Sequence, residues 1–76
     1  MPSVPLLRTR DVVRVFEGLG WRIARQRGSH IIMTRANHPA TLSVPQHPQV
    51  ARGTLRALIV KAGISVEEFL TALNRS

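Results

Sequence analysis

The spacing of apolar residues along the chain changes at Gly20. The apolar positions before this glycine fall at helical spacing: Val12, Val13, Phe16 and Leu19. This spacing predicts a helix that Thr9 caps and that Gly20 ends in a left-handed conformation. After Gly20, Trp21 and Ile23 alternate with Arg22 and Ala24, which predicts a half-buried strand.

Two further strands are predicted at residues 30–34 (HIIMT) and 41–45 (TLSVP), joined by a segment of turn-forming residues. Antiparallel pairing with Ile31 opposite Val44 would place four apolar side chains on one face. A shift by one residue would expose all four to water. We therefore expect the register that pairs Ile31 with Val44.

The outer face of this sheet is predicted to be polar and uncrowded. The register leaves His30 and Ile32 exposed there and brings His47 diagonally near His30. If the first two strands turn at residues 27–29, the small Ala24 would lie across from His30. Nothing large would then cover the histidine.

The remainder of the chain predicts two helices. One ends at Gly63, at the end of the run GTLRALIVKAG, and the next begins with a capping box formed by Ser65 and Glu68. The order αβββαα predicts an α+β domain with a three-stranded antiparallel sheet and helices on one face. We expect a single domain over residues 1–76, with a short flexible segment at residues 1–8.

The charge of the chain points to an anionic partner. Eleven Lys and Arg residues oppose four Asp and Glu residues, for a formal net charge of +7. Nucleic acid, an acidic protein and an anionic membrane surface would all suit this charge. The sequence contains no cysteine, no leader is visible and no run is long enough to span a membrane, so we expect an intracellular, cytoplasmic protein.

The distribution of carboxylates argues against several classes of enzyme. The four acidic residues are Asp11, Glu17, Glu67 and Glu68, so none lies between residues 18 and 66. A two-metal nuclease and a glycosidase both need acids that converge on one site. Glycine-rich nucleotide-binding loops are also missing. We therefore expect neither a metal nor a cofactor.

His30 is the residue whose predicted position best suits catalysis. Imidazole changes its charge near neutral pH, so it can accept the 2′-hydroxyl proton of RNA and return a proton without a metal. The ordinary alternative is a histidine at a strand end that only hydrogen-bonds a neighbour. The residues alone favour neither interpretation.

Other residues near His30 are weaker candidates. Ser29 would be a supporting group, because no base and acid are placed to activate it. His47 is a candidate second catalytic residue only because it is predicted to lie diagonally near His30. His38 is expected at the surface of a turn. Trp21 is expected in the core. Arginines that flank the turn are candidates for RNA phosphate contact, although a solvated charged edge strand would explain them too: Arg22, Arg25 and Arg27.

Three runs of the sequence, LGWRIARQRGSHIIM, LSVPQH and ARGTLRALIVKAGIS, resemble the HicA (YcfA-like) family of bacterial toxins. The resemblance extends from about Thr9 to Leu73. It rests on the order and spacing of several short markers: Gly20-Trp21, Gly28-Ser29-His30, Pro45, His47, Gly53-Thr54-Leu55 and Ala62-Gly63-Ile64. Two positions differ from the usual pattern: Trp21 stands where phenylalanine is frequent, and Ile31 where a second histidine often follows the first.

The resemblance implies a double-stranded-RNA-binding-like fold and a ribosome-independent mRNA interferase. It implies that His30 is catalytic and that a HicB-type antitoxin holds the toxin inactive in a hetero-oligomer. On this basis, the backbone N–H groups of Gly28 and Ser29 could steady developing charge. Two alternatives stay open: a non-catalytic RNA-binding module on the same fold, and a protein-binding adaptor.

Overall fold

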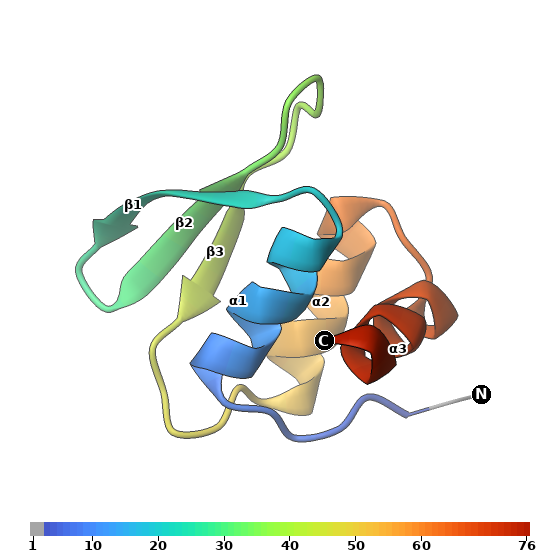
Figure 1. The fold of residues 1–76 in the computed structure, drawn as a ribbon. Helices are drawn as coiled ribbons and strands as arrows, with labels where there is room; N and C mark the ends of the chain where they lie inside the picture. Colours follow the sequence, from blue (N-terminus) through green and yellow to red (C-terminus); the bar gives the residue numbers. More distant parts are fainter. Residues whose placement is uncertain (1–2) are drawn as a thin grey trace.

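Three helices lie on one side of a three-stranded antiparallel sheet in the computed structural model, which describes residues 3–76 (Figure 1). The elements follow the order α1 (Thr9–Gly18), β1 (Arg22–Arg27), β2 (His30–Thr34), β3 (Leu42–Pro45), α2 (Arg52–Ala62) and α3 (Val66–Arg75). This order confirms the predicted α+β class. The strands are ordered β1-β2-β3, so β2 is the central strand and its outer face is free of helices.

The register between β2 and β3 is the predicted one. Ile31 pairs with Val44 and Met33 pairs with Leu42, while His30 lies across from Pro45. Cross-strand partners point to the same face of a sheet, so these apolar pairs face the helices. Met33, Leu42 and Val44 are fully buried.

The predicted register between β1 and β2 is wrong. Arg27, not Ala24, pairs with His30, because the strand continues to Arg27 and only Gly28 and Ser29 form the turn. Gly28 has a φ of +59°, and a glycine with positive φ is what a two-residue hairpin turn requires at its first position. A β-bulge then shifts the register between Ile23 and Arg25.

Strand β1 is exposed along its whole length, so the expectation of a half-buried strand is also wrong. Trp21, the residue before it, is the one that is buried. Strand β1 is an edge strand, and the turn of its hairpin projects beyond α1 (Figure 1). Its inward residue Ile23, the cross-strand partner of Met33, is therefore 48% exposed.

The core lies between the sheet and the helices and is centred on aromatic contacts. The ring of Phe16 lies 5.4 Å from Phe69 and 6.4 Å from Trp21, between ring centroids. Trp21 is buried, as predicted. The predicted capping box of α3 is present, because Ser65 Oγ accepts from Glu68 N and Glu68 Oε1 accepts from Ser65 N. Helix α3 thereby starts where it can place Phe69 in the core.

Thr9 does not cap α1, contrary to the prediction. The N-cap residue is Arg8, and no side chain caps this helix. The Thr9 hydroxyl lies 2.7 Å from the carbonyl oxygen of Pro45 and accepts a hydrogen bond from His47 N. It thus ties the start of α1 to the loop after β3, a contact between residues far apart in sequence.

The segment before α1 lies against the domain in its described part. Val4 is buried, Leu7 forms a β-bridge with Val50, and Arg52 Nε donates to the carbonyl oxygen of Val4 at 3.0 Å. The predicted flexible segment 1–8 includes residues 1–2, which lie outside the described residues. Its flexibility in solution stays a prediction.

The prediction that His38 is a surface residue of a turn is wrong. Its ring is half-buried, with its centroid 4.8 Å from that of Trp21. Ala40 N donates to Nδ1 at 3.1 Å, so the proton of the neutral ring is on Nε2. From there it donates to the carbonyl oxygen of Ala62, 3.2 Å away. His38 therefore joins the β2–β3 loop to the end of α2.

Candidate active site

His30 opens the central strand directly after the tight turn, and its side chain is exposed. Its cross-strand neighbours are Arg27 on one side and Pro45 on the other. Within residues 3–76, the hydrogen bonds to histidine side chains involve His38 and leave the His30 ring unbonded. The ordinary interpretation, a histidine held by a hydrogen bond to a neighbour, therefore has no support in the structure.

A β-bulge brings three arginines onto the face that carries His30. Arg27 pairs with His30 and Arg25 pairs with Ile32, so both arginines share the outer face. Regular alternation would then turn Arg22 to the helix side. The bulge resets the alternation, and Arg22 pairs with Thr34, again on the outer face.

The outer face is more polar than predicted, because Ile32 is only 7% exposed. The expectation that Ile32 is exposed there is wrong. Its position on the central strand explains the difference, since the side chains of Arg25 and Ser43 flank it from both neighbouring strands. The accessible groups around His30 are therefore mainly guanidinium and hydroxyl groups.

The Gly28-Ser29 turn is tied to the loop that follows β3. Gln46 N donates to the carbonyl oxygen of Ser29 at 2.7 Å, and Gln26 Nε2 donates to Gln46 Oε1 at 2.8 Å. The N–H groups of Gly28 and Ser29 donate to no other group among residues 3–76. They are exposed beside His30, where they can donate to an anion.

His47 belongs to the same loop, two residues beyond the end of β3. Its backbone N–H and C=O are both within hydrogen-bond distance of the Thr9 hydroxyl. His47 is one of the residues that line a hollow of about 520 Å³ between α1 and the β1–β2 hairpin. Ile23 and Ile31 line the same hollow, and both point to the helix side. Pro45 lies directly across from His30, and His47 follows two residues later.

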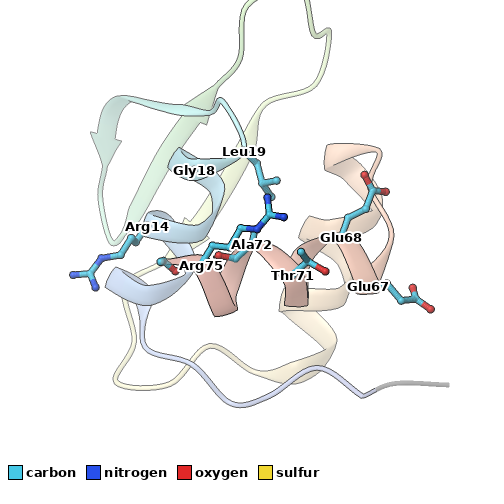
Figure 2. Close-up of a pocket in the computed structure, with 9 residues that line it drawn as sticks. Arg14, Gly18, Leu19, Glu67, Glu68, Thr71, Ala72 and Arg75 are labelled. Atoms are coloured by element: carbon cyan, nitrogen blue, oxygen red, sulfur yellow. Dashed lines mark hydrogen bonds between the residues drawn. The ribbon is translucent and has the colours of Figure 1, made fainter.

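A second hollow, of about 440 Å³, lies between α1 and α3 (Figure 2). Its lining combines Leu19 and Ala72 with charges of both signs, from Arg14, Glu67 and Arg75. None of its lining residues comes from the sheet. It is therefore separate from the face that carries His30.

Two searches of the described residues bear on other kinds of site. Residues 3–76 hold no group of three His, Cys, Asp or Glu side chains that could bind a metal ion together. Over the same residues, no helix has the length and apolar character to cross a membrane.

A family model described as the HicA toxin of bacterial toxin-antitoxin matches residues 9–64 of the 76-residue chain. The match starts with α1 and ends before α3. It includes the whole sheet and both ends of the Gly28-Ser29 turn. No curated protein matches the chain.

Proposed function

The chain belongs to the HicA family of toxins from bacterial toxin–antitoxin systems, and on this premise we propose that it is an endoribonuclease that cleaves mRNA independently of the ribosome. The observation that carries the proposal is the exposed, unbonded imidazole of His30 among three arginines of the same face. Guanidinium groups bind phosphate in a bidentate manner, and an imidazole with free ring nitrogens can act as a general base or acid.

The proposed reaction is a transesterification within the RNA. His30 accepts the proton of a ribose 2′-hydroxyl, and the 2′-oxygen attacks the adjacent phosphorus atom. A P–O bond forms to the 2′-oxygen and the bond to the 5′-oxygen breaks. The leaving oxygen takes up a proton, and the products carry a 2′,3′-cyclic phosphate and a 5′-hydroxyl.

The neighbouring groups have distinct roles in this proposal. Arg27, directly across from His30, holds the scissile phosphate, while Arg22 and Arg25 hold phosphates further along the same face. The free N–H groups of Gly28 and Ser29 stabilise the charge that develops on the phosphoryl oxygens. The Ser29 hydroxyl is a supporting donor.

His47 is the second candidate for proton transfer, as the donor to the leaving oxygen. It lies in the loop after β3, two residues beyond Pro45, the cross-strand neighbour of His30. Replacement of His47 by alanine would then lower the cleavage rate less than replacement of His30. Equal cleavage by His47→Ala and wild-type protein would remove His47 from the mechanism.

The proposal includes a HicB-type antitoxin that neutralises the toxin in a hetero-oligomer in the cytoplasm, where mRNA is found. The net charge of +7 suits an acidic protein partner.

The test is cleavage of a defined RNA by purified wild-type and His30→Ala protein, with and without EDTA. We expect wild-type cleavage to survive EDTA and to leave a 2′,3′-cyclic phosphate, and we expect His30→Ala to cleave at least about 100-fold more slowly. Circular dichroism confirms that the variant is folded. Loss of wild-type cleavage in EDTA, or equal cleavage by both proteins, would contradict the mechanism.

The outer face of the sheet, with Arg22, Arg25 and Arg27, is called the arginine face below. It also suits a second function, a non-catalytic RNA-binding module, because a protein can bind phosphates without cleaving RNA. Such a module would bind duplex RNA with strong salt dependence and release it intact. In that case His30→Ala would leave affinity unchanged, and wild-type protein would leave RNA uncut after long incubation.

A further inference from the structure

The α1–hairpin hollow, lined by Arg10, Val13, Arg14, Ile23, Ile31 and His47 among others, lies on the helix side of β1 and β2. Its volume is about 520 Å³. Ile23 is the accessible apolar residue in it, since Val13 is buried and Ile31 is half-buried. The structure therefore leaves an isoleucine side chain half in water beside a hollow.

Ile23 differs in its surroundings from the other exposed large apolar residues, Leu6 and Val60. Arg10 and Arg14 line the hollow from α1, where residues four apart lie on one face. Val60 lines another groove, between α2 and α3, with one cation and one carboxylate, Arg56 and Glu67. The α1–hairpin hollow is thus an apolar patch with an excess of positive charge.

We propose that the antitoxin docks in the α1–hairpin hollow, where an apolar side chain of the antitoxin covers Ile23 and its acidic residues face Arg10 and Arg14. The inference rests on the toxin–antitoxin function proposed above. An accessible apolar patch with polar surroundings is typical of protein interfaces, and the net charge of +7 favours an acidic partner.

The composition of the hollow favours a protein over RNA as its occupant. The Glu17 carboxylate is part of the lining and would meet an RNA backbone, which carries a phosphate at every nucleotide, whereas a protein can place a neutral or basic residue beside it. The Thr9 hydroxyl is already engaged by the backbone of Pro45 and His47. The apolar lining from Val13, Ile23 and the neighbouring strand suits a side chain more than a phosphate backbone.

Docking in this hollow would also explain how the partner stops the reaction. His47 lines the hollow, so a bound partner would cover the second candidate for proton transfer. Gln46 lines it as well, and its backbone N–H is bonded to Ser29 in the turn before His30. Partner contact would therefore fix the turn from the side opposite the arginine face.

The test measures the affinity of purified toxin variants for the product of the adjacent antitoxin gene by calorimetry, and RNA cleavage by the same proteins. We expect Ile23→Asp and the double variant Arg10→Glu/Arg14→Glu to bind at least about tenfold more weakly, because an anchor or its charge complement is lost. Val60→Asp is the matched control, an equally drastic change at an exposed apolar residue outside the hollow. We expect it to bind like wild type.

The cleavage arm separates this inference from the proposed nuclease function. We expect folded Ile23→Asp to cleave RNA within about twofold of wild type, so that it becomes a toxin that the antitoxin no longer neutralises. Unchanged antitoxin affinity of Ile23→Asp, or no complex with wild type, would overturn the docking proposal. Weakened RNA binding by Ile23→Asp to the same degree would overturn it too, since the hollow would then belong to RNA. If wild type cuts no RNA but Ile23→Asp still binds the antitoxin more weakly, the docking proposal is supported and the proposed nuclease function is contradicted.

Discussion

Two histidines of this chain occupy opposite environments at the two ends of β2. His38 lies in the loop after β2, half-buried against Trp21, with both ring nitrogens hydrogen-bonded. His30 lies after the tight turn before β2, exposed and with its ring unbonded among the described residues. A ring whose nitrogens are both engaged holds structure, whereas a ring with free nitrogens can bind and transfer a proton.

Of the two histidines, the engaged one, His38, should have the larger effect on stability. His38→Ala removes an acceptor from Ala40 N, a donor to Ala62 O and the contact with Trp21, so we expect the free energy of unfolding to fall by about 2–4 kcal/mol. Urea denaturation measures this change. His47→Ala is the control, because within residues 3–76 only the backbone of His47 is hydrogen-bonded. It should cost less than about 0.5 kcal/mol. Equal costs at both positions would refute the structural role of His38.

The turn before His30 should tolerate substitution less well than its open surroundings suggest. Gly28→Ala meets no atom within 4 Å, but its φ of +59° is unfavourable for a residue with a Cβ atom. We expect a loss of about 1–2 kcal/mol in the free energy of unfolding. Gly53→Ala, which also meets no atom and lies in α2, should be neutral or stabilising by up to about 1 kcal/mol. Thermal unfolding of the two variants shows whether each substitution lowers or raises the free energy of unfolding.

The surroundings of His30 can be tested through Arg27, its cross-strand neighbour. Arg27→Ala should weaken RNA binding by about three- to tenfold and reduce the slope of log affinity against log salt by about 1. Fluorescence anisotropy at several salt concentrations measures both. Arg75→Ala removes the same charge from α3 and should change affinity less. Equal effects would mean that the protein attracts RNA by net charge alone.

The smallest effect is expected next to His38. Trp21 Nε1 is buried and has no hydrogen-bond partner among the described residues, a penalty that phenylalanine would not carry. Trp21→Phe also loses ring volume, so the two effects oppose each other, and we expect a net change within about 1 kcal/mol. Chemical denaturation measures it. Trp21→Ala also removes the unpaired N–H but loses the whole ring and leaves a larger cavity. It should therefore cost about 3–5 kcal/mol in the free energy of unfolding.

The parts of the fold that could be predicted from the sequence are those fixed by local pattern or by alternation. Ser65 and Glu68 are three residues apart, so their capping box needs no distant partner. The pairing of Met33 with Leu42 follows from apolar alternation in both strands, which fixes one register. The three-strand, three-helix order follows from the same patterns.

The parts that could not be predicted depend on residues distant in sequence or on weak patterns. Strand β1 has Ile23 as its one large apolar residue, so apolar alternation predicted neither its register nor the bulge that keeps Arg22 and Arg25 on one face. The three-residue spacing of Arg22 and Arg25 was the available signal for that bulge, because regular alternation would place them on opposite faces. The contact of His38 with Ala62 spans 24 residues, and no local pattern indicates it.

The most direct test of the account compares His30→Ala with His38→Ala in one RNA cleavage assay, with rates expressed per folded molecule. The account predicts that His30→Ala unfolds like wild type but loses at least about 100-fold in rate, while His38→Ala is destabilised but cleaves at the wild-type rate when folded. Wild-type cleavage by His30→Ala, or a similar loss of rate in both variants, would contradict the claim that the free imidazole of β2 is catalytic.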